Sequence, residues 1–301
     1  MPASGLIDVK INAKCVLDAK AKVGECPVWD EREQALYWID IQGPDLHRFE
    51  PATGNTRSWK MPALIGSFAL RERGGAIVAL KTGIHFLDFA SSKLTLVGAP
   101  EAHLPGNRMN DGKAGPDGRF WVGSMDDRWP DKTTTAALYR VDADLSIHRM
   151  VEGLICSNGL AWSLDGRTMY HSDSRLNFVC SYDYEPATGA IGKRRDLEYD
   201  PDALGRPDGG TVDSEGFYWI CGVTAGRLNR FRPDGGLDRS VEIPVPSPTN
   251  CIFGGPDFRT LYVTTKRYRE DPALLEAHPL MGGIFAVDVG VAGGPSARFA
   301  G

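Results

Sequence analysis

The 301-residue sequence lacks the patterns that mark several large protein classes. No apolar run approaches the roughly 18 residues of a membrane-spanning helix. The first residues have neither a basic start nor the apolar core of a secretory signal, so we expect a cytoplasmic protein. The densest basic group, Lys193 to Arg195, is typical of a solvated turn, and the net charge at pH 7 is −5. We therefore expect neither a membrane nor a nucleic acid as a partner.

Cysteine is sparse and widely spaced. No C-x-x-C pair occurs, which argues against a disulfide framework and favours reduced, mostly buried thiols, as expected in the cytoplasm. The six cysteines are Cys15, Cys26, Cys156, Cys180, Cys221 and Cys251. The histidines show no metal-ligand spacing, and no G-x-S-x-G motif occurs, so a serine esterase is not favoured.

What the chain does contain is a repeated strand pattern. Short aromatic or β-branched runs such as ALYWIDI, RFWVGSM and TLYVTT recur at intervals of roughly 40 to 50 residues, and turns rich in Gly, Asp or Pro precede most of them. The markers of this repeat are Tyr37, Val78, Trp121, Tyr170, Tyr218 and Tyr262.

A repeat of this length is typical of β-propeller blades. We predict an all-β, six-bladed propeller with four-stranded antiparallel blades, formed by residues 1–301 as a single domain. Residues 10–18 precede the first repeat and are expected to complete the last blade, which closes the ring and hides sheet edges. A β-sandwich with irregular strands is the alternative. Asp271 to His278 is the one expected helix, in an insertion where a lid could lie.

The repeat also aligns a set of polar residues. Counting back roughly ten to twelve residues from each marker reaches Glu25, Gly66, Asn110, Asn158, Asp208 and Asn250. The first strand of a propeller blade lies nearest the axis, so these positions should meet in the central channel. Carboxylate and amide oxygens suit one divalent ion, which could be Ca²⁺, Mg²⁺, Mn²⁺, Zn²⁺ or Fe²⁺. The alternative is that Asn and Asp merely begin turns.

Several motifs resemble one family in the order in which they occur. They are GECPVWD, RMNDGKAGPDGRFWVGSM, CSNGLAWSLDGRTMYHSDS, PDGGTVDSEGFYWICG and FGGPDFRTLYVTT. Together they resemble the SMP-30/gluconolactonase/luciferin-regenerating-enzyme (LRE) family over almost the whole chain, and KTGIH, HSDS and PLMGGIFAVDV look closest to the bacterial sugar lactonases.

The resemblance implies a divalent metal in the axial channel, with Glu25, Asn158 and Asp208 as its ligands. It also implies that Asp208 acts as the general base and that Arg108 and Asn110 hold the substrate. Periodicity alone selects Asn250. From its place in HSDS, Asp173 is a further candidate substrate residue, as an acceptor for sugar hydroxyls.

The sequence departs from the family pattern in two places. Cys26 stands where many relatives have Gly, and its sulfur leaves the identity of the metal open. Some relatives have a substrate-binding Glu where direct register places Arg128, so Asp126, Asp127 and Arg128 are all candidates for that role. In the same loop, Trp129 is expected to face the pocket or solvent.

The reading favoured by the sequence is metal-dependent hydrolysis of a sugar-acid lactone, such as a pentonolactone or gluconolactone, by a monomer. A bound cation would polarise the ester carbonyl, and Asp208 would accept a proton from water. Three alternatives stay open. They are a calcium-binding regulatory protein without turnover, a metal-dependent organophosphatase or arylesterase, and a scaffold propeller.

Overall fold

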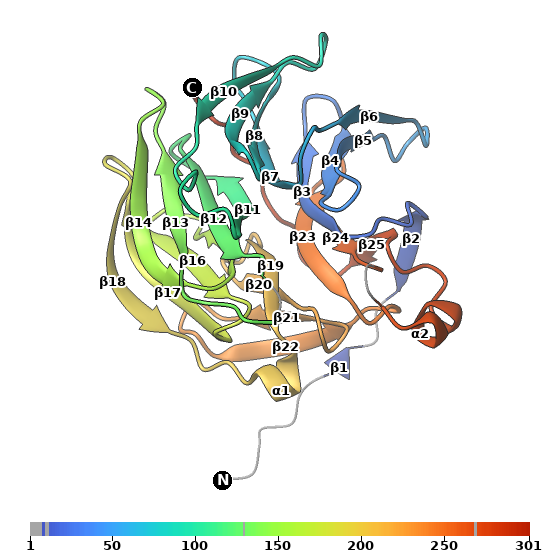
Figure 1. Ribbon diagram of the computed structural model, residues 1–301. Helices are drawn as coiled ribbons and strands as arrows, with labels where there is room; N and C mark the ends of the chain where they lie inside the picture. The colour runs from blue at the N-terminus through green and yellow to red at the C-terminus, as the bar shows by residue number, and fades with distance from the viewer. Residues whose placement is uncertain (1–7, 10–11, 129, 268–269) are drawn as a thin grey trace.

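The computed structural model describes residues 8–9, 12–128, 130–267 and 270–301. Within these ranges six β-sheets are arranged around a central axis, as Figure 1 shows. Five of the sheets contain four antiparallel strands, and the sixth contains four antiparallel strands with a short fifth strand at its outer edge. The predicted all-β, six-bladed propeller with four-stranded antiparallel blades is therefore confirmed.

In every blade the first strand of the repeat lies nearest the axis. These inner strands are β3 (Gly24–Asp30), β7 (Ile65–Leu70), β11 (Asn107–Ala114), β15 (Ser157–Trp162), β19 (Pro207–Val212) and β23 (Pro248–Gly254). The second strands, which carry the aromatic markers, are β4 (Ala35–Asp40), β8 (Ala76–Leu80), β12 (Phe120–Asp126), β16 (Thr168–Asp173), β20 (Tyr218–Gly222) and β24 (Thr260–Thr265).

The outer strands complete each blade. The third strands are β5 (Asp45–Phe49), β9 (Gly83–Leu87), β13 (Ala136–Val141), β17 (Phe178–Glu185), β21 (Arg227–Phe231) and β25 (Ile284–Asp288). The fourth strands of blades 1 to 5 are β6 (Thr56–Lys60), β10 (Leu94–Gly98), β14 (Ile147–Leu154), β18 (Ala190–Asp196) and β22 (Leu237–Glu242).

The N-terminal part of the chain contributes to two blades. The strand β2 (Ala13–Leu17) pairs antiparallel with β25 and is the outermost strand of blade 6. It lies within the expected range 10–18, of which residues 10–11 fall outside the described residues. The short strand β1 (Asp8–Val9) pairs parallel with β22. Blade 5 therefore has a short fifth strand besides its four antiparallel ones.

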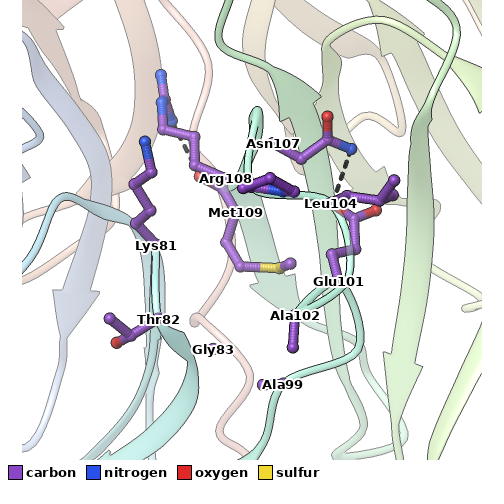
Figure 2. Close-up of a pocket in the computed structure, with 11 residues that line it drawn as sticks. Lys81, Thr82, Gly83, Ala99, Glu101, Ala102, Leu104, Asn107, Arg108 and Met109 are labelled. Carbon is purple, nitrogen blue, oxygen red and sulfur yellow. Dashed lines mark hydrogen bonds between the residues drawn. The ribbon is translucent and has the colours of Figure 1, made fainter.

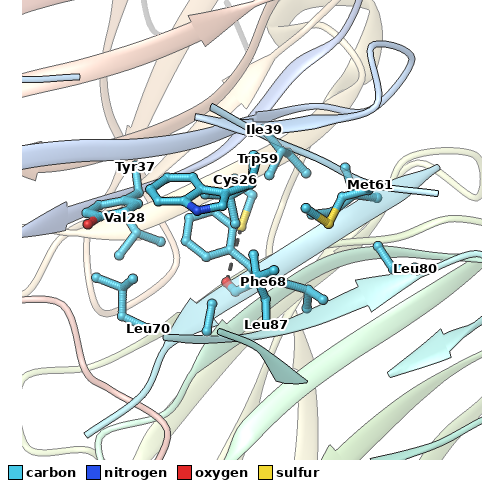
Figure 3. Packing of buried hydrophobic residues seen from close by; sticks show 14 of the residues in the cluster. Cys26, Val28, Tyr37, Ile39, Trp59, Met61, Phe68, Leu70, Leu80 and Leu87 are labelled. Carbon is cyan, nitrogen blue, oxygen red and sulfur yellow. Dashed lines mark hydrogen bonds between the residues drawn. The ribbon is translucent and has the colours of Figure 1, made fainter. Parts of the chain in front are cut away.

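Aromatic side chains pack the blades against one another. Figure 3 shows the cluster between blades 1 and 2, where the fully buried Tyr37 and Trp59 lie against side chains of β7, β8 and β9. Between blades 4 and 5, Tyr170 stacks on Tyr218 with ring centroids 4.4 Å apart. Such pairs add about 0.5–1.5 kcal/mol to the stabilisation from burial alone. Since neighbouring blades cover both faces of these sheets, second strands such as β4 and β8 are nearly continuous apolar runs rather than alternating ones.

Two short helices interrupt the strands. The predicted helix is α2 (Pro272–Ala277), with Asp271 as its N-cap. The sequence analysis missed α1 (Pro201–Leu204), although Asp200 caps it in the same Asp-Pro pattern. Leu274 and Leu275 of α2 pack against the apolar cluster of blades 5 and 6, and Figure 1 shows α2 at the periphery, so the helix is no lid over the axis. Among the described residues, no helix is both long enough and apolar enough to cross a bilayer.

Candidate active site

All six inner strands are irregular where they begin. The pairing register shifts near the first residues of each inner strand, at Glu25, Ile65, Met109, Asn158, Pro207 and Pro248. A β-bulge leaves residues unpaired and redirects their side chains. The repeated bulge therefore turns polar side chains towards the axis at one end of the propeller, which we call the polar end.

Asp208 and Asn158 meet at the polar end from neighbouring blades. The amide nitrogen Nδ2 of Asn158 donates a hydrogen bond of 2.5 Å to Oδ1 of Asp208, and another of 3.0 Å to the Ser174 hydroxyl. Asn158 is buried, whereas Asp208 keeps part of its surface exposed. No described residue donates a hydrogen bond to Oδ2 of Asp208, so this oxygen is available to a ligand.

A second group joins Glu25, Asp111 and Asn250. Nδ2 of Asn250 donates to Oε2 of Glu25 at 3.0 Å and to Oδ1 of Asp111 at 3.3 Å. Asn250, which periodicity alone had selected, therefore bridges two carboxylates from different blades. Asp111 was missed because the repeat selects only its neighbour, Asn110. The bulge between Met109 and Gly112 exposes both residues to the axis, and the N-D-G motif at this point was the available signal.

Close approach of the inner strands explains why two positions at the polar end, Gly66 and Gly209, are glycine. At Gly66, the ring position without a polar group, an added Cβ would lie 2.3 Å from the Met109 carbonyl oxygen. At Gly209 it would lie 2.0 Å from Cγ of Asn250. The inner strands approach one another so closely here that only glycine fits. Cys26 adopts a left-handed backbone with φ of 46°, the region that glycine favours.

The three carboxylates disfavour one another's ionised forms. Burial and the charges of Asp208 and Asp111 raise the pKa of Glu25 well above its ordinary value. Burial raises the pKa of Asp208 to about 7, with Asp111 contributing in the same direction, and burial also raises the pKa of Asp111. Like charges that converge in a buried site favour protonation of one member or the presence of a cation.

The donor set fits a hard divalent cation. Three carboxylates and two amides supply oxygen atoms of the kind that Ca²⁺, Mg²⁺ and Mn²⁺ prefer. Among the described residues, no three His, Cys, Asp or Glu side chains form a metal-holding group by themselves. An ion would therefore need amide oxygens as well, and Asn158 would have to present Oδ1 rather than the Nδ2 that now faces Asp208.

Arg108 and Asn110 hold each other beside this centre. Nη1 of Arg108 donates hydrogen bonds of 2.9 Å to the Met109 carbonyl and to Oδ1 of Asn110. The Asn110 amide donates in turn to the Ser157 carbonyl at 2.9 Å. Arg108 also lines a cavity of about 360 Å³ next to blades 2 and 3, which Figure 2 shows. The guanidinium is therefore fixed in orientation at the border between the axial carboxylates and an open cavity.

Asp173 has a different role from the one expected of it. Its carboxylate accepts hydrogen bonds from four backbone N–H groups, those of Ile155, Cys156, Arg175 and Leu176. A carboxylate has about four acceptor positions, and the residue is fully buried. Asp173 thus shapes the turn after β16, and no acceptor remains for a sugar hydroxyl.

The loop after β12 separates its three candidate residues. Asp126 is buried and accepts both a bidentate pair of hydrogen bonds from Arg128 and one from the Thr133 backbone. These bonds hold the pKa of Asp126 well below its ordinary value. Asp127 lies 3.5 Å from Nε of Arg108. Of the three, only Asp127 faces a proposed substrate residue. Trp129 lies outside the described residues.

A serine–histidine pair was also missed. The Ser157 hydroxyl lies 2.9 Å from Nε2 of His171, although the two residues are on different strands. Both are fully buried, and His171 Nδ1 has no hydrogen-bond partner within the described part of the chain. A nucleophile would need access to substrate and a histidine oriented by a third group. The pair lacks both, so we interpret it as interior packing between two neighbouring strands of blade 4.

Comparisons with known proteins place these residues in context. Residues 23–267 match the SMP-30/Gluconolactonase/LRE-like region. A 6-deoxy-6-sulfogluconolactonase from Pseudomonas putida is 39% identical over 290 residues, which cover 96% of this chain and 98% of that protein. Regucalcin from Xenopus laevis is 35% identical over 296 residues, covering 97% and 99%. The crystal structure of a calcium-binding protein, regucalcin, from Agrobacterium tumefaciens superposes with a TM-score of 0.91 at 26% identity, covering 96% and 98%.

Proposed function

The chain belongs to the SMP-30/gluconolactonase/LRE-like family, and from this premise we propose that it is a metal-dependent lactonase that opens a sugar-acid lactone to the aldonic acid. One observation carries the proposal. Oxygen-bearing side chains from separate blades converge at the polar end of the axis, directly beside an arginine and an asparagine that can hold a polyhydroxylated substrate. The similarity to a protein named for its sulfogluconolactonase activity supports the same reaction class.

In this proposal Glu25, Asn158 and Asp208 hold one divalent cation, and Asp111 and Asn250 complete its surroundings. When bound, such a cation supplies Lewis-acid polarisation of the ester carbonyl and offsets the charge that develops on its oxygen. Asn250 keeps the carboxylates of Glu25 and Asp111 in place through its two hydrogen bonds. The proposed resident ion is one of Ca²⁺, Zn²⁺, Mg²⁺, Mn²⁺ and Fe²⁺, and reloading the protein with each ion distinguishes them.

Asp208 is the proposed general base. Because Asn158 would turn its amide oxygen towards a bound cation, its hydrogen bond to Oδ1 of Asp208 belongs to the metal-free state. Oδ2 of Asp208 has no hydrogen-bond donor among the described residues. That oxygen accepts a proton from the water that attacks the carbonyl carbon. The bond between the carbonyl carbon and the ring oxygen then breaks, and the proton passes from Asp208 to the ring oxygen, which leaves as a hydroxyl. Meanwhile Arg108 and Asn110 hold the sugar, so that the carbonyl stays over the axial centre.

The experiment is to strip the protein of metal, reload it with each of the five ions separately, and follow lactone opening by acid release. We expect turnover of glucono-1,5-lactone or a pentonolactone with at least one ion, loss of turnover on chelation, and loss in Glu25→Gln. Full turnover by the stripped protein would contradict the metal requirement.

A second candidate function is regulatory calcium binding without turnover. It is favoured by the oxygen-only donor set and by the similarity to proteins named regucalcin. It predicts that one Ca²⁺ binds tightly while no lactone is opened with any of the five ions. The fixed orientation of Arg108 and Asn110 favours the enzyme, because an ion-binding protein does not need a substrate-holding pair.

A further inference from the structure

Cationic side chains surround the polar end of the axis. The register of each blade pairs the start of the inner strand with the end of the second strand, as Ile65 with Leu80 and Pro248 with Thr265. Residues that directly follow the second strands must therefore lie around the same end as the axial carboxylates. Lysine occupies this place in two blades, as Lys81 and Lys266, and Arg175 lies two residues after the end of β16.

Other cations reach the same end from the remaining strands. Arg108 lies near the start of β11, and Arg206 directly precedes β19, where Val223 and Thr224 fix its backbone. Lys132, in the loop after β12, donates its amine to the Asp126 carbonyl. We call the six residues Lys81, Arg108, Lys132, Arg175, Arg206 and Lys266 the basic rim. It draws on blades 2 to 6.

Acidic side chains neutralise only part of the basic rim. Lys266 pairs with Glu270, and Arg108 lies 3.5 Å from Asp127. Among the described residues, neither Lys81 nor Arg206 forms an ion pair. The rim cations also repel one another. Burial lowers the pKa of Arg175 and the charge of Arg206 lowers it further, while burial and then Arg175 act in the same way on Lys132.

Nearby carboxylates do not account for Lys81. It is exposed and lines the cavity that also contains Glu101, but that carboxylate already accepts hydrogen bonds from Asn107, Ser124 and Tyr139. In Figure 2 the Lys81 amine and the Arg108 guanidinium extend in the same direction, away from Glu101. Two cationic groups thus reach one side of a cavity that adjoins the axial centre.

The axial carboxylates do not balance the rim either. A divalent cation at the axis would offset two of the three negative charges of Glu25, Asp111 and Asp208. The rim would then face the entering substrate with a net positive charge. Such an arrangement accelerates the encounter with anions and binds an oxyanion through charge-assisted hydrogen bonds.

We propose that the basic rim binds an anionic group on the sugar, so that the preferred substrate is a lactone bearing a carboxylate, sulfonate or phosphate remote from its ester. This inference rests on the proposed lactonase function and adds the substrate class to it. Lys81 is the specificity-determining residue, because it forms no ion pair within the described residues, whereas the charge of Arg206 already acts on Asp208.

The test compares three lactones with the metal-loaded enzyme. Glucono-1,5-lactone is neutral, 6-deoxy-6-sulfoglucono-1,5-lactone carries a sulfonate, and a glucaric acid monolactone carries a carboxylate. We expect kcat/KM to be about tenfold or more higher for at least one anionic lactone, and to fall with added salt for that lactone alone. In Lys81→Gln, KM for that lactone should rise about tenfold while kcat stays within twofold.

Lys193→Gln is the matched control, because Lys193 is an exposed lysine on β18, the outermost strand of blade 4. It should leave all three KM values within twofold. Equal kcat/KM for the neutral and anionic lactones, or a tenfold rise of KM for the neutral lactone as well as for the anionic one in Lys81→Gln, overturns the anion site while the lactonase function stands. Failure of the metal-loaded enzyme to open any lactone overturns the proposed function itself.

Discussion

The two ends of the propeller axis are built from the same six strands and have opposite chemistry. On β23, Asn250 bridges two carboxylates at one end, and two residues later Ile252 lines an apolar cavity of about 270 Å³ at the other. On β3 the same change separates Glu25 from Val28. We call this second end the apolar end. Polarity along an inner strand therefore follows depth along the axis rather than the alternation of a half-buried sheet.

The apolar end is covered by the chain's own C-terminal segment. Residues 294–297 line the apolar cavity, and backbone hydrogen bonds join this segment to blades 6, 2 and 3 through Gly293, Phe299 and Ala300. Arg298 forms an ion pair with Asp30 of blade 1. At the polar end the described residues instead bring together the carboxylates and amides of the candidate site. One end of the axis therefore carries apolar contacts that stabilise the fold, and the other carries the polar groups of the proposed chemistry.

The largest expected difference between the ends is in catalysis. Asp208→Asn removes the proposed base and should lower kcat by about 10²- to 10⁴-fold. The free energy of unfolding should stay equal or rise, because a buried carboxylate with a raised pKa destabilises the fold. Val212→Ala, at the apolar end of the same strand, is the control and should keep kcat within twofold. Comparable losses of kcat in Asp208→Asn and Val212→Ala would contradict the claim that only the polar end takes part in catalysis.

At the apolar end, a substitution should have its largest effect on the free energy of unfolding rather than on catalysis. Phe299 is fully buried under blades 2 and 3, and Phe299→Ala should lower the free energy of unfolding by about 3–5 kcal/mol in urea titrations. The activity per folded molecule should not change. A variant that keeps its stability, or one that loses kcat while still folded, would show that the two ends are not separable.

A third test uses two residues on one strand. Asn250→Ala leaves Glu25 and Asp111 without their shared donor and should lower kcat/KM by about 10- to 100-fold, as for other residues that orient metal ligands. Ile252→Val should instead cost about 1 kcal/mol of stability and no activity. The interpretation of Asn250 is wrong if its variant retains wild-type kcat/KM with saturating metal.

The smallest expected effect is a change of stability with pH that comes from the buried side chain of His171. Burial lowers the pKa of His171 to about 4 despite the opposing charge of Asp173, with Arg194 acting in the same direction as burial. Between pH 6.5 and 4 the unfolded chain therefore binds a proton that the folded chain does not, and stability falls as the pH falls. We expect a loss of about 1 kcal/mol between pH 7 and 5.5. In His171→Gln this component should disappear, and an unchanged pH dependence would argue against it.

The sequence predicted the architecture because each blade repeats the same aromatic second strand. Tyr37 and Tyr170 can be aligned without coordinates, and the same alignment selects Glu25, Asn158 and Asp208 as neighbours. It could not select Asp111, because side-chain direction at a bulge depends on strand pairing rather than on spacing. The contact of Ser157 with His171 was missed because it too depends on side-chain direction beside a bulge. The cover formed by Phe299 was missed because it joins the C-terminal segment, which lies outside the repeat, to blades 2 and 3.

The most direct test of this account is an anomalous-difference map from crystals soaked in Mn²⁺. We predict one strong peak at the polar end, within about 2.6 Å of carboxylate oxygens from both Glu25 and Asp208 and of the Asn158 amide oxygen. A peak elsewhere, or none in crystals of an enzyme that turns over lactone with Mn²⁺, would contradict the claim that side chains from separate blades share a catalytic cation.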